Sequence, residues 1–417
     1  MNRKTNVMLS IITLSLVYAI SCIFKMSSNI VMPIFQDSFN MTSSLTGFIT
    51  GSYYFLYAPM QLLAGPLCHK WNAHKVVGTF IIISALGSIV TAFATSSITV
   101  LIGRTLIGLG VGPIYISTIY YIYTITNSKT YPIAIGLSMT VGNLGAAISS
   151  GPLKHAIDTF GIKNTFLCIA LLLVLNSIVL FVLNALSNEN VQVCLKKESL
   201  FQNLKTGLQY LVKSPMLIMG TIMWLMFNSL QLTYQGLWSA KWFVAAYPKL
   251  SNVAPWSATV AAVGLSVGSL VAEPLRIKKH PRWKSTSISE FGLSLMGFLI
   301  VISHQLDKFA ITSNSLIIAI VLTVDFFIGY SMGAICLMLT AITRDRTDSS
   351  INANIMGIMN GSGSIACIFF QWLTGKLYDG FSQSYTPNTS YSFVFLIMSL
   401  IIFVVAIITS YTQKIGK

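Results

Sequence analysis

Apolar segments about as long as a bilayer is thick recur along the whole chain of 417 residues. A helix that crosses the hydrocarbon core needs about 20 mostly apolar residues, because each residue rises about 1.5 Å and the core is about 30 Å thick. Several segments exceed that length, so tilted or kinked helices are expected. The chain is predicted to hold twelve spanning helices, at residues 7–31, 45–66, 75–95, 98–123, 131–153, 163–186, 216–246, 255–277, 285–304, 311–341, 351–378 and 390–411.

The composition excludes a soluble globular protein of this length. Hydrophobic residues make up 54% of the chain and charged residues only 9%, whereas soluble chains carry roughly 25% charged residues. A net charge of +15 on a soluble chain would suggest nucleic acid. Here the basic residues are better explained as residues of cytoplasmic loops. The predicted partner is therefore the lipid bilayer and not a nucleic acid.

One long polar stretch, residues 187–214, interrupts the apolar pattern, with six predicted spans before it and six after it. The chain is therefore predicted to divide into an N-terminal six-helix bundle at 1–186, a cytosolic linker at 187–214 and a C-terminal six-helix bundle at 215–417. The start of the chain imitates a signal peptide, but its apolar run continues through Ile30 with only Lys25 interrupting it. We interpret it as an uncleaved first span.

The basic residues predict an orientation. Most of the 26 Lys and Arg residues fall on one side of the predicted spans, and only Lys154, Lys163, Lys249, Lys308 and Lys376 fall on the other. By the positive-inside rule both termini are cytoplasmic, and we expect a monomer in a bacterial inner membrane. Asn40 and Asn388 begin glycosylation sequons in predicted outer loops, a pattern short enough to arise by chance.

The second predicted inner loop carries a family resemblance. It begins at Gly65 and contains the basic residues Lys70, His74 and Lys75. This spacing resembles the loop between helices 2 and 3 of the major facilitator superfamily. His69 stands where that family has an aspartate and Asn72 where it has a glycine, so the charge relay of the family's loop is not carried over. An ordinary basic loop is the alternative.

Small residues recur at helical spacing in several predicted spans, which allows a neighbouring helix to approach closely. In the resembled family these helices line the moving contact between the two halves, so a gating role is predicted; plain helix packing is the alternative. The Gly151–Pro152 pair partly resembles the family's helix 5 antiporter pattern, but His155 and Ala156 stand where a second glycine pair belongs. The predicted gating and helix-packing residues are Gly65, Lys70, His74, Lys75, Gly142, Gly145, Pro152, Gly264, Gly268, Gly357 and Gly361.

Three cations, Lys25, Arg104 and Lys241, lie within predicted spans and are predicted to face a central cavity and contact substrate. A cation at mid-bilayer costs at least about 2.5–3.5 kcal/mol unless it faces water or a partner. The run after Lys25 resembles the first helix of the superfamily's organophosphate and organic-anion members, where a basic residue meets substrate. The alternatives are snorkelling of Lys25, carbonyl bonding by Arg104 near the membrane rim, and an interfacial position for Lys241.

Polar and aromatic side chains on other spans complete the predicted site, and Asp325 is the one acid well inside a span. A carboxyl in a low dielectric favours its protonated form and could carry a proton. Helix 7 also resembles that of bacterial solute permeases, where the segment breaks and closes the outer mouth. The further predicted substrate contacts are Tyr53, Tyr57, Gln61, Tyr234, Trp238, Asn360 and Gln371.

The sequence predicts an all-α polytopic membrane protein with the twelve-helix fold of this superfamily. Its predicted function is secondary transport of a small anionic or zwitterionic organic solute by alternating access; proton coupling through Asp325, exchange and facilitated diffusion stay open. A multidrug/proton antiporter is the first alternative and a non-transporting receptor or scaffold the second. No catalytic motif, metal-like histidine spacing or cofactor site occurs, so an enzyme is not predicted.

Overall fold

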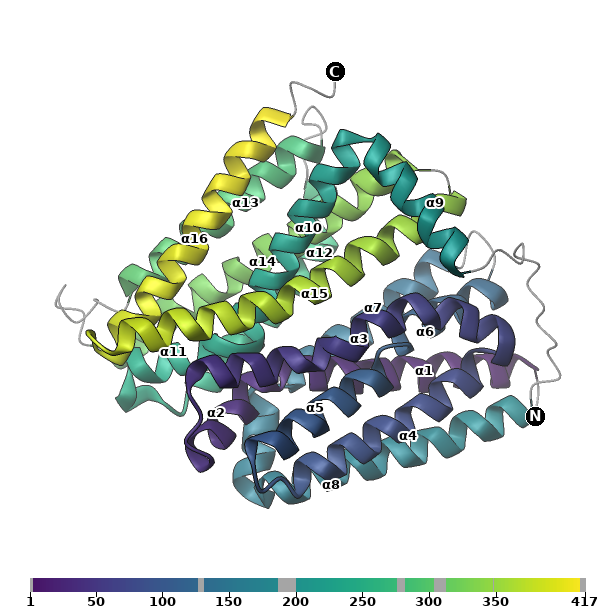
Figure 1. Cartoon of the computed structure of the whole chain (residues 1–417), viewed down its shortest axis with the longest axis horizontal. Helices are drawn as coiled ribbons and strands as arrows, with labels where there is room; N and C mark the ends of the chain where they lie inside the picture. The colour runs from purple at the N-terminus through teal and green to yellow at the C-terminus, as the bar shows by residue number, and fades with distance from the viewer. Residues whose placement is uncertain are drawn as a thin grey trace. The chain divides into compact units, whose positions relative to one another are not determined.

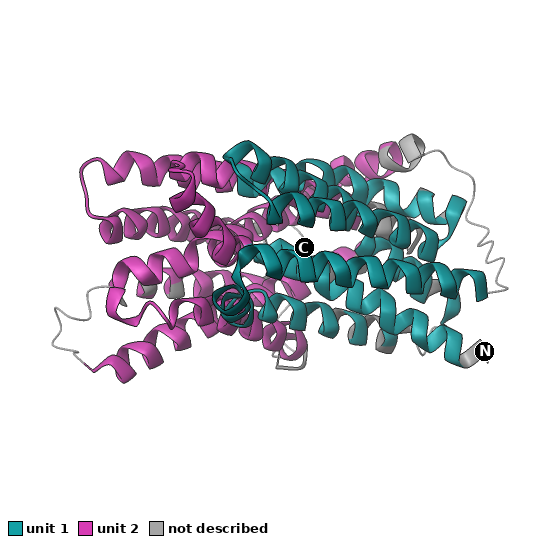
Figure 2. Cartoon of the chain, turned by 90° about the horizontal axis from the view of Figure 1, so that it is seen from below, with its two compact units in different colours: residues 1–27, 49–203 teal, residues 28–48, 204–417 magenta. Residues whose placement is uncertain are grey.

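The computed structural model describes residues 3–126, 131–186, 200–275, 282–303, 313–347 and 349–412. Helices dominate these ranges, and no β-strand occurs within them. Contacts divide the chain into two compact units, the first formed by residues 1–27 and 49–203 and the second by residues 28–48 and 204–417 (Figure 2). The predicted division at 187–214 stays a prediction.

The first unit is built from long helices that pack side by side in pairs. Within it α4 lies along α8 and along α5, and α1 lies along α7 (Figure 1). Its helices are α1 (Arg3–Met26), α3 (Ser43–Trp71) from residue 49 onward, α4 (Ala73–Ala92), α5 (Ser97–Val111), α6 (Ile114–Ile125), α7 (Tyr131–Ile148) and α8 (Gly151–Leu186).

The second unit pairs its helices in the same way. Its α12 lies along α14, α13 along α16, and α10 along α15 (Figure 1). It contains α2 (Ser28–Ser38), the start of α3, α9 (Leu200–Lys213), α10 (Pro215–Thr233), a π-helical turn at Tyr234–Trp238, α11 (Ser239–Ala246), a 3-10 turn at Pro248–Leu250, α12 (Ala254–Leu275), α13 (Arg282–Ser303), α14 (Asn314–Asp345), α15 (Ser349–Ser382) and α16 (Pro387–Thr412).

Within the described ranges each predicted span coincides with helix, and eight of the helical segments are long and apolar enough by themselves to cross a membrane. The edges differ by a few residues, and α4 ends at Ala92, before the predicted end at residue 95. α3, α14 and α15 continue several residues past the predicted ends, because hydropathy marks only the part of a helix inside hydrocarbon. α8 contains the end of the fifth predicted span and all of the sixth, joined at Gly161, whose φ of 77° turns the chain.

The predicted linker is partly helical. Residues 187–199 lie outside the described residues, but 200–213 form α9. Leu208 and Val212, four residues apart on its surface, are exposed, while Leu211 is buried. An amphipathic helix therefore forms within a stretch that composition alone marked as polar.

Glycines allow the closest helix contacts in both units. A Cβ at Gly264 would lie 2.1 Å from the Phe326 carbonyl oxygen, and one at Gly329 would lie 1.9 Å from the Ala261 carbonyl oxygen. α12 and α14 thus meet backbone to backbone. In the first unit, a Cβ added to Gly145 of α7 would lie 2.2 Å from the carbonyl oxygen of Ala19 on α1. The small residues Gly145 and Gly264 therefore lie at close helix contacts within their own units.

The turn between α3 and α4 is a single residue, Asn72. It has φ 60° and ψ 164°, a conformation that glycine adopts far more easily than other residues. Its Oδ1 accepts from Lys75 N at 3.1 Å, which caps α4, and its Nδ2 donates to Asn184 Oδ1 at 2.6 Å. The place where the resembled family has glycine is therefore a place where the backbone needs it, and two side-chain hydrogen bonds hold asparagine there instead.

Candidate functional site

Lys25 lies at the end of α1, one residue before the helix ends at Met26; the chain resumes as α2 at Ser28. Its side chain is half-buried, and Nζ lies 5.9 Å from the centroid of the Tyr57 ring. Across the described part of the chain the only ion pair joins Lys154 and Asp158, so no described acid neutralises Lys25. A cation held against an aromatic face without an acidic partner can receive an anion.

Arg104 of α5 is almost fully buried, with 5% of its surface exposed. Its guanidinium donates to the Phe24 carbonyl at 3.1 Å and the Thr50 carbonyl at 3.3 Å, and it lies 5.1 Å from the centre of the Tyr53 ring. The Phe24 carbonyl belongs to the last turn of α1, where the helix ends and carbonyls lose their intrahelical partners. Arg104 therefore stabilises the break beside Lys25, and its contact with substrate stays a prediction.

Three polar side chains of α3 share this region of the first unit. Tyr53 and Tyr57 stack with ring centroids 5.3 Å apart. Gln61 Nε2 donates to the Gly112 carbonyl at 2.9 Å, at the break between α5 and α6 before Pro113. The Tyr53 hydroxyl and Gln61 Oε1 are buried with no hydrogen-bond partner among the described atoms. Buried polar atoms without a hydrogen-bond partner are rare in folded proteins, and a polar group of a bound ligand would supply the missing partner.

Asp325 of α14 and Tyr234 of the π-helical turn form the polar centre of the second unit. Asp325 is fully buried, and the Tyr234 hydroxyl donates to its Oδ1. Ser257 of α12 faces the same carboxyl. No basic side chain is bonded to it in the described residues. A π-helical turn shifts side chains out of ordinary helical register and is frequent at functional sites, and here it aims Tyr234 at the acid.

Trp238 and Lys241 lie about one and two turns further along the same segment. Lys241 bonds to Gln36 Oε1 of α2, and its Nζ lies 5.0 Å from the centroid of the Trp238 ring. Trp238 is buried, its Nε1 donates to Thr374 Oγ1 at 2.9 Å, and its ring packs on Tyr391. Both side chains are thus occupied within the second unit. That Lys241 and Trp238 bind substrate stays a prediction.

Gln371 and Asn360 lie on α15. The Nε2 of Gln371 donates to the Leu232 carbonyl at 3.3 Å, immediately before the π-helical turn, while its Oε1 is buried without a partner in the described structure. Asn360 is half-buried. Gln371 has the same arrangement as Gln61 of the first unit: its amide group bonds a backbone carbonyl at a helix irregularity, and its oxygen is left available.

The predicted gating residues fall in different surroundings. Lys70 and Lys75 are exposed, but His74 is buried, with Nε2 2.9 Å from Ser10 Oγ and its ring edge-on to Tyr121. His74 is therefore a packed residue of α4 and not part of a solvated basic loop. Gly142, Gly145, Gly264 and Gly268 meet neighbouring helices at under 3 Å from an added Cβ, whereas Gly65 and Gly361 have nothing within 4 Å. Pro152 is exposed, and Gly357 lies on α15.

A set of contacts around residues 28–48 was missed by the sequence analysis. Asn29, fully buried, donates to Ser239 Oγ at 2.9 Å and accepts from Ala240 N at 3.2 Å. Asp379 at the end of α15 accepts from Ser43 N at 2.9 Å and Ser44 N at 2.7 Å. These two backbone N–H groups begin α3 and have no intrahelical partner, so Asp379 caps a helix more than 300 residues away in sequence. Residues 28–48 are tied to the second unit although the chain on both sides of them belongs to the first.

Comparisons with known proteins identify the fold. The model of the Major Facilitator Superfamily matches residues 14–371. Among solved structures, the nucleoside transporter NupG aligns with a TM-score of 0.74 at 13% identity, covering 97% of this chain and 99% of that chain. The D-xylose-proton symporter aligns with a TM-score of 0.71 at 13% identity, covering 96% and 97%. A bacterial homolog of the human lysosomal transporter Spinster aligns with a TM-score of 0.70 at 13% identity, covering 98% and 96%.

One curated relative is similar in part. It is the probable sulfoacetate transporter SauU of Cupriavidus necator, 24% identical over 159 residues, which are 36% of this chain and 35% of that protein. The match thus spans about a third of the length of that relative. Together with the helices long enough to cross a bilayer, the family match confirms the predicted twelve-helix, all-α fold and the prediction that this is an integral multi-pass transport protein and no enzyme. The chain belongs to the major facilitator superfamily.

Proposed function

We propose that this transporter carries a small anionic or zwitterionic organic solute by alternating access, in a bacterial inner membrane, as a monomer with both termini in the cytoplasm. The observation that carries the proposal is Lys25, a half-buried cation in the first unit against the Tyr57 ring with no described acidic partner. An unneutralised ammonium inside a membrane protein is tolerated where an anion completes it.

Unpaired polar atoms of the first unit support a polar solute. The Tyr53 hydroxyl and Gln61 Oε1 are buried without partners among the described atoms. Each would cost about 1–3 kcal/mol if nothing ever bonded it. A solute with an acidic group for Lys25 and hydrogen-bonding groups for these side chains satisfies both requirements, while a purely lipophilic cation satisfies neither.

The partial relative points the same way. SauU is named as a probable sulfoacetate transporter, and sulfoacetate is a small organic anion. The solved neighbours carry other solutes, a nucleoside in one case and D-xylose in another, so the shared fold by itself does not choose among substrates. The charge at Lys25 is what favours the anion here.

Replacing Lys25 with alanine is expected to weaken binding of an organic anion by about 30-fold, because a charge-assisted contact contributes about 2 kcal/mol. Lys25→Arg should keep most of the affinity because it keeps the charge. The measurement is a thermal-shift and calorimetric screen of the purified protein against organic acids, phosphate esters, dipeptides and cationic dyes. Lys163→Ala, at an exposed lysine of the same unit, is the control. Binding of cationic dyes alone would favour the multidrug antiporter instead.

We propose Asp325 as the proton-carrying group. Replacing it with asparagine should abolish solute accumulation driven by a pH gradient, while exchange of labelled for unlabelled solute continues, because the neutral amide copies the protonated acid but cannot release a proton. Tyr234→Phe removes the hydroxyl that donates to Asp325 Oδ1 and should change the pH dependence without abolishing coupling. Accumulation by the asparagine variant at the wild-type level would remove Asp325 from the mechanism.

A further inference from the structure

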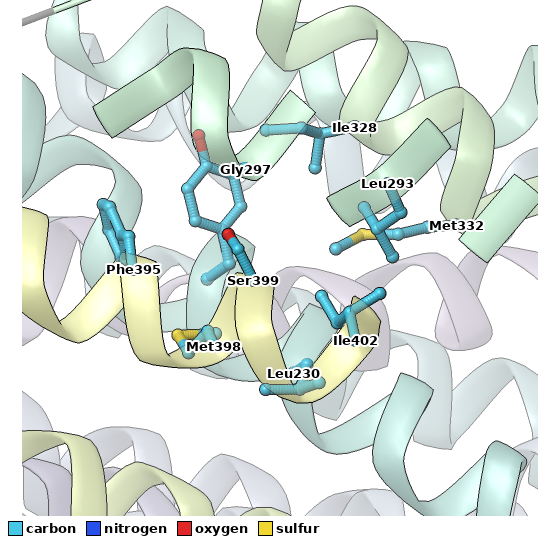
Figure 3. A pocket seen from close by; sticks show the side chains of 10 residues that line it. Leu230, Leu293, Gly297, Ile328, Met332, Phe395, Met398, Ser399 and Ile402 are labelled. Carbon is cyan, nitrogen blue, oxygen red and sulfur yellow. The ribbon is translucent and has the colours of Figure 1, made fainter. Parts of the chain in front are cut away.

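Two cavities lie inside the second unit, among α10, α13, α14 and α16. The first has about 360 Å³ of empty space and is lined by Tyr234, Met332, Phe395 and Ser399, among others (Figure 3). The second has about 290 Å³ and is lined by Met223, Phe227, Ile335 and Glu290, among others. Leu230, Leu293 and Ile402 line both cavities. The two cavities therefore share part of their lining.

Among the residues that the structure describes, Glu290 is the only acidic side chain that lines either cavity. It lies on α13, two turns in from the start of the helix, with 3% of its surface exposed. Its Oε2 has no hydrogen-bond partner among the described atoms, and the Thr409 hydroxyl of α16 faces the carboxyl. The rest of the second cavity's lining is apolar. A carboxyl with one oxygen unbonded at the wall of a cavity is available to a proton or a water molecule.

No charge compensates Glu290 from the described helices around it. α10 (Pro215–Thr233) and α16 (Pro387–Thr412) contain no acidic or basic residue, and between Asn314 and Thr343 the only one on α14 is Asp325. On its own helix, Arg282 and Lys284 lie about two turns away, at the helix start. An isolated carboxylate in such surroundings costs several kcal/mol. The neutral acid is therefore the stable form of Glu290 in this conformation.

The first cavity connects this region to Asp325. Tyr234 lines that cavity and donates its hydroxyl to Asp325 Oδ1. Ser399, on the same helix as Phe395, adds a second hydroxyl to the lining of that cavity (Figure 3). The order of groups is thus Asp325, Tyr234, first cavity, second cavity, Glu290, all within one unit.

We infer that Glu290 is a second proton-binding carboxyl and exchanges a proton with Asp325 through water admitted to the two cavities. The step is balanced: the O–H bond of protonated Glu290 breaks, water relays the proton, and an O–H bond forms on the Asp325 carboxylate, so the negative charge passes to Glu290. This inference rests on the proposed role of Asp325 and adds the route by which its proton arrives or leaves. A chain of buried ionisable groups is a means by which membrane transporters move protons.

Infrared difference spectroscopy of the purified protein across a pH titration tests the inference without any solute. Among the titrating carboxylic acid bands of the wild type, Glu290→Gln should remove one and Asp325→Asn a second. Asp158→Asn, at an exposed acid of the first unit, is the control and should change neither band. A Glu290 band that stays protonated or absent at every pH at which the protein remains folded would overturn the inference.

The route itself is tested by filling the wall that the cavities share. Leu293→Phe should leave both bands in place but slow deuterium exchange of the Asp325 carboxyl by about tenfold or more, while Leu293→Ala should not slow it. Unchanged exchange in both Leu293→Phe and Glu290→Gln would show that the proton of Asp325 travels another way. Binding of a hydrophobic amine that removes the Glu290 band would make the cavity an amine site and also overturn the inference.

The outcomes separate this inference from the proposed coupling. If the Glu290 and Asp325 bands do not both titrate but pH-driven transport is intact, the inference about Glu290 is wrong and the proposed coupling stands. If both bands titrate but Asp325→Asn leaves pH-driven transport unchanged, the proposed coupling through Asp325 is wrong instead.

Discussion

Replacing Gly329 with valine is expected to prevent stable packing of the second unit. A Cβ at this position would lie 1.9 Å from the Ala261 carbonyl oxygen and 2.9 Å from the Leu265 nitrogen. Both are backbone atoms of α12, so no side-chain rotation relieves the clash and the helices must separate. Gly264, Gly268 and Gly333 meet the facing backbone about as closely, so the whole crossing opens. The expected loss of stability is about 3–5 kcal/mol, seen as a fall of about 10 °C or more in Tm.

The matched control is Gly361→Ala on α15, where nothing lies within 4 Å of the added Cβ. This change should leave Tm unchanged or raise it slightly, since alanine favours helix over glycine by about 1 kcal/mol. The measurement is thermal unfolding of the two purified variants in the same detergent. Equal Tm values for the two variants would show that the close α12–α14 contact does not exist in the folded protein.

Replacing Asp379 with alanine is expected to release the start of α3. The carboxylate accepts two hydrogen bonds from N–H groups that have no intrahelical partner. These groups lie at the N-terminus of α3, where the helix dipole favours a negative charge. Together these contacts should be worth about 2 kcal/mol, so amide exchange at Ser43 and Ser44 should rise about 30-fold. Mass-spectrometric hydrogen exchange of the residue 40–48 peptide measures this.

The same variant has a functional consequence. Residues 28–48 follow the second unit while their neighbours in sequence belong to the first, so any movement of one unit relative to the other must bend the chain near these residues or break their contacts. Weakening the Asp379 contact should therefore change the transport rate. Asp37→Asn, an exposed acid of α2 with no described hydrogen bond, is the control. Unchanged exchange at residues 40–48 in Asp379→Ala would contradict this account of the 28–48 segment.

The sequence predicted the spans well because apolar length is a direct physical requirement of the bilayer. It also located the irregular part of the seventh span, since glycine and tryptophan there resemble a known break, and the structure has a π-helical turn at Tyr234–Trp238. Of the predicted small residues, Gly142, Gly145, Gly264 and Gly268 lie at close helix contacts, whereas Gly65 and Gly361 have nothing within 4 Å of an added Cβ. The sequence could not say which helix would be the partner, because spacing describes one helix and contact involves two.

Other features were beyond sequence reasoning for identifiable reasons. The free-energy cost of placing Arg104 in the membrane is the same whether its guanidinium contacts substrate or the Phe24 carbonyl. The sequence therefore cannot distinguish a substrate-binding role from a structural one. Asp379 looks like an ordinary acid at a helix end until the fold brings Ser43 to it. Glu290 lies near the start of a predicted span, and its isolation depends on the absence of charge from helices that are distant in sequence. Each case depends on long-range packing.

The measurement that tests the central claim most directly is uptake into proteoliposomes of a panel of labelled organic anions, with competition by unlabelled anions and by lipophilic cations. The account predicts that at least one small organic anion is taken up, that other anions compete and lipophilic cations do not, and that Lys25→Ala abolishes this uptake whereas Lys25→Arg retains it. Uptake or extrusion of lipophilic cations with no anion transported, or anion uptake that Lys25→Ala leaves unchanged, would contradict it.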